Sequence, residues 1–418
     1  MTDNFPRLFR VRQNFPRPAL SDIPAEIMAQ VRALNLNVRK GATVAVACPS
    51  RGLAAFPDLV RGTVAALKEL GLSPFLVPAM GSHGSGTAEG QERVLVEYGL
   101  TEDKVGAPIR SQLDVVEIGR TPQGIPVYLD KLAHGADYLV ILNRVKKHTD
   151  FEGEIESGLM KICGIGLGKL AGATMYHQAM MTHGPVTMIR DIAQTLVANT
   201  NFLFGVGSVE NAYLDVAEVK VLTGPNLLEG EKELLKASKK LSPKLPFDEG
   251  HILWIDETGK DISGSGIDTK VIGRISAPLF SPDPASPRFR RIMVSDITAA
   301  SHGNTGGLAQ ADLVSRRLFD KIDREANDLN IITSCVLEMG KIPPVAENDR
   351  EAFKILMRSV GLVEPQDIRY MRIKNTLRLV EVELSEPYYA LARGRDDLTI
   401  ISEPAPPVFD AQGYFPEF

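Results

Sequence analysis

Short apolar runs alternate with longer amphipathic segments along the first 250 residues. Four runs have the length and apolar character of buried strands, at residues 43–48, 74–78, 137–143 and 201–207. Between them the pattern predicts helices, including one over 57–70 and one that ends near Tyr98. Strands that alternate with helices are typical of βαβ units, so we expect a mainly parallel sheet.

The pattern changes after Leu234. Residues 234–250 (LLKASKKLSPKLPFDEG) are polar, basic and interrupted by proline, which is typical of a linker. Beyond it we expect further strands and two long helices: strands at 252–256, 292–296, 331–335 and 377–384, and helices at 307–327 and 349–360. The chain is therefore predicted to form two α/β domains, residues 1–245 and 246–418, with mainly parallel sheets and an active site in the cleft between them.

Composition narrows the class of protein. Of the 418 residues, 44% are hydrophobic and 24% are charged, which is ordinary usage for a globular protein. Lys and Arg number 47 against 52 Asp and Glu, and this net charge of −5 gives no global attraction for nucleic acid or an anionic membrane. The three distant cysteines form no disulfide framework, and neither a signal peptide nor a membrane-spanning run is present. We expect a cytoplasmic protein whose ligand is held by a local pocket.

Two histidines directly follow predicted strands. His83 lies in GSHGSG after the run at 74–78, and His148 lies in RVKKHTD after the run at 137–143. The carboxyl ends of parallel strands meet at one edge of a sheet, where ligands bind. Either histidine alone is as readily a turn-capping surface residue, but two at equivalent strand ends favour a functional role. Imidazole suits acid/base chemistry because its pKa lies near neutral pH.

Arg51 and Lys161 are positively charged residues, and the position of each allows either a structural or a functional role. Arg51, after the strand at 43–48, can hold a carboxylate bidentately or pair with a local acid. Lys161 lies in the apolar run GLMKIC, where it is either a snorkelling surface lysine or a partly desolvated amine suited to covalent attachment.

The chain contains no self-sufficient metal motif of the H-x₃-H, H-E-x-x-H or C-x-x-C kind, so a closed zinc site is not indicated. Residues 166–171 match G-x-G-x-x-A, but the preceding segment is not a clean strand and no acid is placed to hold a ribose. The dinucleotide signal is therefore weak.

Taken together, these residues resemble the nickel-pincer-nucleotide-dependent lactate racemase family, whose members racemise or epimerise 2-hydroxy acids. In that family a histidine is followed by a lysine that forms a thioamide with the cofactor, and sixteen residues later by a nickel-binding histidine. His148, Lys161 and His177 occur here in that order, with sixteen residues from Lys161 to His177.

The resemblance implies that Lys161 carries the nickel-pincer nucleotide, Ni(II) pyridinium-3,5-bisthiocarboxylic acid mononucleotide, and that His177 is the metal ligand. The cofactor would supply sulfur, carbon and sulfur donors, so one imidazole completes the tetragonal coordination that suits Ni(II). This also accounts for the missing metal motif.

The resemblance further implies an isomerase that works by hydride transfer. The cofactor accepts hydride from the carbon that bears the hydroxyl, while a histidine takes the hydroxyl proton. His83 and His148 form the acid/base pair, one for each enantiomer, and Arg51 anchors the substrate carboxylate. The expected partners are a small-molecule 2-hydroxy acid and the enzymes that synthesise the cofactor, with no nucleic acid and no membrane.

The sequence departs from the lactate enzymes in three places. Three extra residues separate His148 from Lys161, and no aspartate precedes Arg51. The loop SHGNTGG of the second domain lacks the lysine that binds substrate in the lactate enzymes, so His302 and Asn304 become the candidate substrate-binding residues. We therefore expect a 2-hydroxy acid that is larger than lactate or differently charged.

Two other classes stay open. An NAD-dependent oxidoreductase of a small hydroxy acid would use residues 166–171, and a non-catalytic carboxylate-binding protein would use Arg51 with His83 and His148. The racemase or epimerase is favoured because it alone explains the order of His148, Lys161 and His177.

Overall fold

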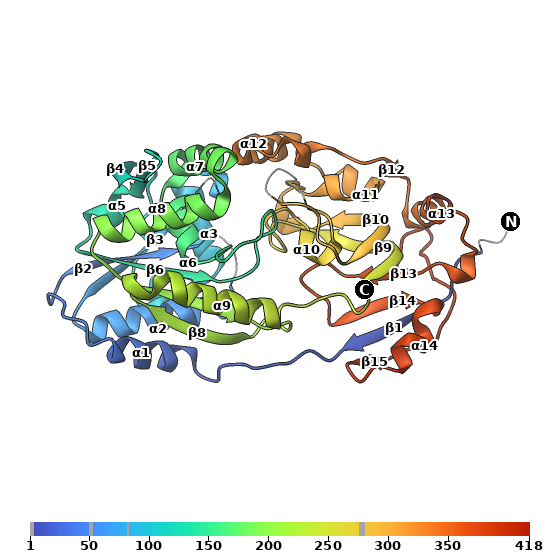
Figure 1. Ribbon diagram of the computed structural model, residues 1–418, viewed down its shortest axis with the longest axis horizontal. Helices are drawn as coiled ribbons and strands as arrows, with labels where there is room; N and C mark the ends of the chain where they lie inside the picture. The colour runs from blue at the N-terminus through green and yellow to red at the C-terminus, as the bar shows by residue number, and fades with distance from the viewer. Residues whose placement is uncertain (1–3, 50–52, 82, 276–280) are drawn as a thin grey trace. The chain divides into compact units, whose positions relative to one another are not determined.

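The computed structural model (Figure 1) describes residues 4–49, 53–81, 83–275 and 281–418. The chain forms two compact units. The N-terminal unit comprises Arg17–His148 and Glu152–Ser242, and the C-terminal unit comprises Met1–Pro16, Thr149–Phe151 and Pro243–Phe418. No helix in the described part of the chain is both long and apolar enough to cross a membrane.

The N-terminal unit is built around a five-stranded sheet of order β3-β2-β6-β7-β8. The first four strands are parallel and β8 is an antiparallel edge strand. Their bounds are Ser73–Pro78 (β3), Thr43–Cys48 (β2), Tyr138–Arg144 (β6), Phe202–Glu210 (β7) and Val216–Leu222 (β8). The four strands predicted from apolar runs in this part of the chain are confirmed. A two-stranded hairpin of β4 (Val115–Arg120) and β5 (Pro126–Asp130) completes the unit's strands as described.

Helices cover both faces of this sheet, and β7 shows why. Phe204 and Val206 point to the face that shares a core with α1 (Ile23–Ala33) and α2 (Phe56–Glu69). Gly205 and Gly207 point to the other face, where a Cβ would lie 2.9 Å and 2.6 Å from leucine side chains of α6 and α9. Because side chains alternate along a strand, the glycines let helices approach one face closely.

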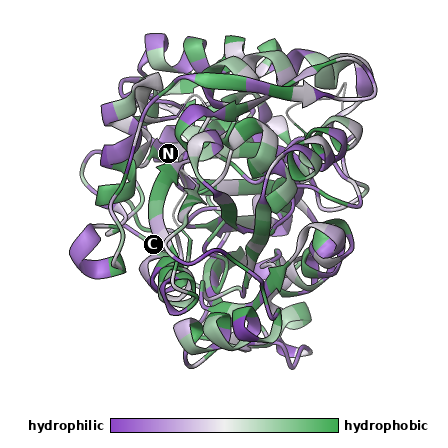
Figure 2. Ribbon diagram, turned by 90° about the vertical axis from the view of Figure 1, so that its left-hand side faces the viewer, coloured by the Kyte–Doolittle hydropathy of each residue, from purple (hydrophilic) through white to green (hydrophobic). Residues whose placement is uncertain are grey.

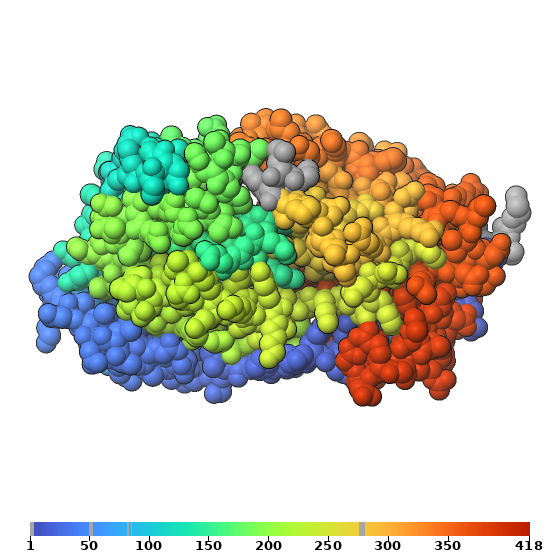
Figure 3. All heavy atoms as spheres, in the orientation of Figure 1, coloured from blue at the N-terminus to red at the C-terminus, as the bar shows by residue number. Residues whose placement is uncertain are grey.

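The remaining helices of this unit vary from a single turn to fifteen residues. They are α3 (Ala88–Glu97), α4 (Glu102–Val105), α5 (Lys131–Gly135), α6 (Leu159–Lys161), α7 (Lys169–His183), α8 (Pro185–Asn199) and α9 (Leu227–Leu241). Helix α9 buries Leu234 and Leu235 and leaves Lys236 and Lys240 exposed. Figure 3 shows this outer face at the surface. The helix therefore runs into the stretch that the sequence had predicted to be a linker, and it ends at Leu241.

The C-terminal unit contains an eight-stranded sheet of order β12-β11-β10-β9-β13-β14-β1-β15. The strands from β12 to β13 are parallel, while β14, β1 and β15 pair antiparallel. Their bounds are Val345–Ala346 (β12), Leu313–Ser315 (β11), Arg288–Ile297 (β10), Glu249–Thr258 (β9), Tyr370–Ile373 (β13), Glu381–Ser385 (β14), Leu8–Gln13 (β1) and Leu398–Ile400 (β15). The α/β class with mostly parallel sheets is confirmed, and Figure 2 shows hydrophobic strands beside helices of mixed character.

Two predictions in this unit are wrong. Residues 307–327 are not one helix but contain β11, α11 (Arg316–Phe319) and the start of α12 (Arg324–Ser334). Ser315 and Asp323 accept hydrogen bonds from backbone N–H groups three residues ahead, so each begins a new helix. Residues 331–335 are the end of α12 and not a strand.

The structure contains the helix predicted at 349–360 and part of the strand predicted at 377–384. Helix α13 (Asp349–Ser359) confirms the helix predicted at 349–360, and the strand predicted at 377–384 is β14, which begins only at Glu381. Two more short helices are α10 (Thr269–Ile272) and α14 (Tyr389–Arg393).

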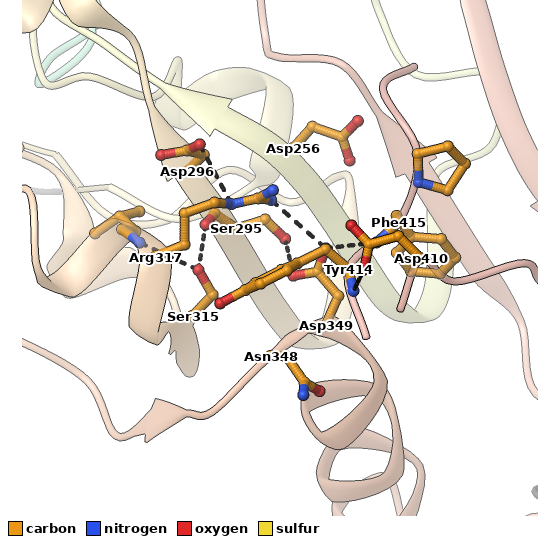
Figure 4. A network of polar contacts seen from close by, with 12 residues as sticks. Asp256, Ser295, Asp296, Ser315, Arg317, Asn348, Asp349, Asp410, Tyr414 and Phe415 are labelled. Atoms are coloured by element: carbon orange, nitrogen blue, oxygen red, sulfur yellow. Dashed lines mark hydrogen bonds and ion pairs between the residues drawn. The ribbon is translucent and has the colours of Figure 1, made fainter. Parts of the chain in front are cut away.

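The carboxyl edge of the C-terminal sheet is occupied by polar side chains of the strands and by the end of the chain (Figure 4). The Ser295 hydroxyl donates to Asp349 Oδ1 over 2.9 Å, and the Phe415 backbone N–H donates to Asp349 Oδ2 over 3.0 Å. Arg317 lies between Asp296 and Asp349, with N–O distances of 3.3 and 3.5 Å. We call residues 410–418 the C-terminal strap.

A second arginine holds the strap from the same sheet. Arg372 of β13 binds Asp256 through two hydrogen bonds of 2.7 and 2.9 Å and donates to the Pro416 carbonyl over 2.8 Å. Its guanidinium also lies 4.4 Å from the centre of the Phe415 ring. Phe415 thus joins the strap to the core of this unit.

Candidate active site

His148 lies on the segment that leaves β6, and a buried carboxylate holds this segment. Two backbone hydrogen bonds of 2.8 and 3.1 Å pair Lys146 with Ser157 and close the loop between them. The Glu156 side chain is fully buried, and its Oε2 accepts a 2.6 Å hydrogen bond from the His148 backbone N–H. Its Oε1 forms a 2.6 Å ion pair with Lys239 of α9. The half-buried imidazole of His148 is therefore carried by an anchored backbone.

Lys161 lies at the end of α6, on a segment fixed from two sides. Asn143, near the end of β6, donates from Nδ2 to the Gly158 carbonyl over 2.8 Å, and Glu231 of α9 accepts the Met160 N–H over 2.8 Å. A Cβ at Gly158 would lie 2.4 Å from Glu231 Oε1, so only glycine allows this approach. A π-helical turn over Ile162–Gly166 follows Lys161 directly. Such turns are rare and are found frequently at functional sites.

The structure brings two of the predicted site residues into direct contact. Lys161 Nζ lies 2.9 Å from His148 Nε2. A hydrogen bond at this distance needs a lone pair on one nitrogen, so a charged amine and a charged imidazole do not coexist there. Either an ammonium donates to a neutral imidazole, or an imidazole N–H donates to a neutral amine. The second form provides the nucleophilic amine that covalent attachment needs.

The loop that carries His83 packs against the segment after Lys161. The Gly81 N–H donates to the Gly166 carbonyl over 3.2 Å, and a Cβ at Gly81 would lie 2.8 Å from the Ile165 carbonyl oxygen. Gly81 also has φ of +59°, a conformation that glycine adopts without strain. His83 itself is half-buried at the start of a short 3₁₀ turn over Gly84–Gly86.

A buried lysine that the sequence analysis did not single out supports this loop. Lys169 is 1% exposed, and its Nζ lies 3.0 Å from Asp130 Oδ2. The same ammonium donates to the Pro78 carbonyl over 2.6 Å and to Gln91 Oε1 over 3.1 Å. Gln91 in turn donates to the carbonyls of Gly81 and His83, over 3.0 and 3.3 Å. Burial lowers the pKa of Lys169, which Asp130 partly offsets.

Two buried acids, Glu156 and Glu231, were also missed. Glu156 holds the backbone of the His148 segment, and Glu231 holds the backbone of the Lys161 segment. Burial raises the pKa of Glu231 to about 7. In the sequence, the one sign of Glu231 is that it shares a helix face with Leu234 and Leu235, where an apolar residue would be expected. Its contact with Met160 joins residues 71 apart in the chain, so no local pattern predicts it.

His177 lies on α7 and is half-buried. It follows Ala173 by four residues, so the two side chains share a helix face. The Ala173 Cβ would lie 3.4 Å from a Cβ at Gly81, which places this face of α7 beside the His83 loop. The segments of all four predicted residues, His83, His148, Lys161 and His177, are thus linked by contacts within the N-terminal unit.

The other predicted residues are placed elsewhere. Arg51 lies outside the described residues. His302 and Asn304 belong to the C-terminal unit, after β10; His302 is exposed with φ of +47°, and Asn304 donates to the Ala326 carbonyl over 3.3 Å. Their roles in substrate binding stay predictions.

The donor chemistry fits a cofactor that brings most of its own metal ligands. No three His, Cys, Asp or Glu side chains within the described ranges cluster as a metal site. The N-terminal unit instead offers an amine beside a base, a glycine-rich turn and one imidazole on a neighbouring helix. Residues 166–171 follow a helical turn and not a strand, so the match to G-x-G-x-x-A lacks the context of a dinucleotide loop.

Comparisons with known proteins bear on the family and the fold. Residues 37–188, which include His83, His148, Lys161 and His177, match the family model of the lactate racemase N-terminal domain. The fold is similar to the lactate racemase apoprotein from Thermoanaerobacterium thermosaccharolyticum, with a TM-score of 0.50, 13% identity and coverage of 88% of this chain and 99% of that chain. It is also similar to a Thermotoga maritima protein, with a TM-score of 0.52, 12% identity and coverage of 84% and 96%. A search of curated proteins finds no match.

The fold therefore defines an α/β protein with the architecture of lactate racemase. More particularly, residues 37–188 match the model of the lactate racemase N-terminal domain, and the resemblance of the chain to the lactate racemase family is confirmed.

Proposed function

We propose that the protein is a racemase or epimerase of a 2-hydroxy acid, with a nickel-pincer nucleotide attached at Lys161. The observation that carries this proposal is the contact between Lys161 Nζ and His148 Nε2, 2.9 Å apart, within a lactate racemase N-terminal domain. It puts an attachment amine and a candidate base side by side on two anchored segments.

In the proposed enzyme, Lys161 and His177 hold the cofactor, His177 as the protein's ligand to nickel. When bound, this group supplies a hydride acceptor for the carbon that bears the hydroxyl. The residues of the chain move the proton: His148 Nε2 takes it from the hydroxyl of one enantiomer, and His83 serves the other.

Attachment at Lys161 also changes what His148 does. An amine that has become a thioamide nitrogen carries no positive charge and keeps a single N–H, so the ammonium that could hold the imidazole lone pair is gone. His148 Nε2 is then available to a substrate hydroxyl. The contact in the unmodified chain thus keeps the candidate base in place until the cofactor is attached.

Substrate recognition is proposed to involve Arg51, which would bind the carboxylate, together with His302 and Asn304. Because no lysine occupies the loop of His302, the substrate is proposed to be larger than lactate or differently charged. Enzymes that synthesise the cofactor are the proposed partners.

The test is to produce the chain with and without the cofactor-synthesis enzymes and to measure intact mass and nickel. Wild type should gain the cofactor mass and about one nickel per chain. Lys161→Ala should lose the mass increment, and His177→Ala should keep it but lose nickel. A chain that binds NAD and gains neither mass nor nickel would be an oxidoreductase and not a racemase.

A second test addresses the proton chemistry. With a 2-hydroxy acid deuterated at carbon 2, the label should survive inversion, because hydride held on carbon does not exchange with water. His83→Ala and His148→Ala should each lower kcat by ~10²–10⁴ while cofactor attachment is unchanged. Loss of the deuterium to solvent during turnover would show that a histidine removes the carbon-bound hydrogen as a proton.

A further inference from the structure

A cavity of about 340 Å³ lies at the amino end of the C-terminal sheet, within the C-terminal unit. It is formed where β9 and β10 begin and where the chain enters β13, three strands that are neighbours in the sheet. The residues that line it are Glu249, Gly250, His251, Arg288, Phe289, Arg290 and Arg369.

The charge of this cavity is unbalanced. Three guanidiniums line it against the single carboxylate of Glu249. Arg288 donates to the Ala285 carbonyl over 2.9 Å and Arg290 to the Val360 carbonyl over 2.5 Å, and within the described chain neither they nor Arg369 form an ion pair.

Other arginines of the unit behave differently. Arg274 pairs with Asp312 at 2.8 Å, and Arg372 pairs with Asp256 at 2.7 Å. Asp248, the acid next to Glu249 in the chain, acts on Arg395 and raises its pKa, together with Asp397. The cavity therefore keeps a surplus of positive charge in a unit where guanidiniums are commonly paired.

His251 adds a donor of defined direction. Its Nδ1 accepts a 3.0 Å hydrogen bond from the Arg369 backbone N–H, so the neutral imidazole carries its proton on Nε2. Burial lowers the pKa of His251, and the charges of Arg290 and Arg369 lower it further. These two guanidiniums and the imidazole thus share one space, and at neutral pH the imidazole contributes an N–H without a charge.

We propose that this cavity is a binding site for a small polyvalent phosphate compound, with Arg288, Arg290 and Arg369 on the phosphate oxygens and His251 Nε2 as a further donor. Guanidinium forks match phosphate geometry bidentately, and the volume lies in the range of small-ligand sites. The site does not rest on the proposed function.

Its position makes it a second site. His302 and Asn304 follow the carboxyl end of β10, whereas Arg288 and Arg290 lie at its amino end. A strand of ten residues spans roughly 30 Å. A ligand in the cavity therefore does not touch those candidate substrate residues.

The experiment is calorimetric titration of the full chain with pyrophosphate at fixed ionic strength. Tricarballylate, a tricarboxylate without a hydroxyl group, is the carboxylate arm. Wild type should bind pyrophosphate saturably and more tightly than tricarballylate. Arg369→Gln, which breaks no side-chain bond of the described structure, should weaken binding about tenfold, and Arg290→Gln/Arg369→Gln should weaken it further. Glu249→Gln should tighten binding, because it removes the opposing charge.

Arg393→Gln is the matched control, since Arg393 is an exposed arginine of α14 outside the cavity. It should bind pyrophosphate like wild type. Equal affinity of wild type and Arg369→Gln would overturn the proposal, as would the absence of saturable binding to wild type. Tighter binding of tricarballylate than of pyrophosphate would overturn the assignment to phosphate.

Discussion

The two sheets present their carboxyl edges in different ways. In the N-terminal unit the edge carries glycine-rich loops with His83, His148 and Lys161, and these loops are held by buried groups from behind. In the C-terminal unit much of the corresponding edge is filled by the C-terminal strap, whose backbone binds Asp349 and Arg372 (Figure 4). The carboxyl edge of the N-terminal sheet thus carries candidate catalytic side chains, whereas the C-terminal strap packs against the carboxyl edge of the C-terminal sheet.

Each edge contains a buried ion pair, and the two pairs differ in the part of the chain that they support. Lys169 and Asp130 support Gln91, which binds the backbone of His83. Arg372 and Asp256 support the strap. Both pairs contribute to stability, but only the first is connected to a candidate catalytic side chain.

The largest expected effect comes from breaking these pairs. Lys169→Met should lower the free energy of unfolding of the N-terminal unit by about 3–5 kcal/mol, because it leaves the buried Asp130 without its partner. Asp256→Ala should destabilise the C-terminal unit by less, because Arg372 keeps Glu383 at 3.5 Å. Calorimetry of the two unfolding transitions measures this. Only Lys169→Met should also lower kcat of the loaded enzyme at a temperature where both variants are folded. An equal loss of kcat in Asp256→Ala would remove the distinction between the edges.

The next largest effect concerns the strap. Phe415 is buried against Trp254 and Phe409, with ring centroids 5.1 and 4.6 Å away. Phe415→Ala should destabilise the C-terminal unit by about 3 kcal/mol and leave the N-terminal transition unchanged. Val408→Ala, at an exposed position just before the strap, is the control and should have no effect. A wild-type transition in Phe415→Ala would mean that the strap does not belong to the core.

A pH-dependent effect is expected at the N-terminal edge. Burial raises the pKa of Glu231 from an ordinary 4.5 to about 7, so the folded chain binds a proton that the unfolded chain has released. The stability from this group is complete below pH 4.5 and is lost as the pH rises through 7, on the order of 3 kcal/mol in total.

Glu231→Gln should therefore flatten the fall in the N-terminal transition between pH 4.5 and about 7. The C-terminal transition, measured in the same scans, should keep its pH dependence. An unchanged N-terminal profile would mean that Glu231 is ionised in the folded chain.

The smallest effect is expected from an exposed pair. Arg32 and Glu69 join α1 to α2 through hydrogen bonds of 2.6 and 2.7 Å, with both side chains largely in solvent. Exposed pairs are screened and contribute little. Arg32→Gln should leave both unfolding midpoints unchanged at physiological salt, and a clear fall would show that geometry can outweigh exposure here.

The sequence predicted the helices and strands that a local hydrophobic pattern defines. It did not predict contacts between residues that lie far apart in the chain. The strand at 43–48 was predicted to the residue, because its apolar run is uninterrupted. Ile331 and Ile332 suggested a strand, yet they end a helix in which Ile332 is 65% exposed, since a short apolar run does not distinguish the two. At the candidate site the resemblance to the lactate racemase family implied a joint role for His148 and Lys161, and the 2.9 Å contact agrees with it. Lys169 and Glu231 were missed because their partners are distant in sequence.

The position of β1 has a consequence for biosynthesis. Leu8–Gln13 pairs on one side with β14 and on the other with β15, strands that lie more than 360 residues later. The ribosome releases β1 early, but it cannot join the sheet until almost the whole chain has been translated. The N-terminal unit, whose strands are all encoded before residue 243, is complete by then. During translation the segment of β1 therefore stays without its partner strands, even after the N-terminal unit is complete. A chaperone that shields residues 8–13 would act between the synthesis of β1 and the synthesis of β14 and β15.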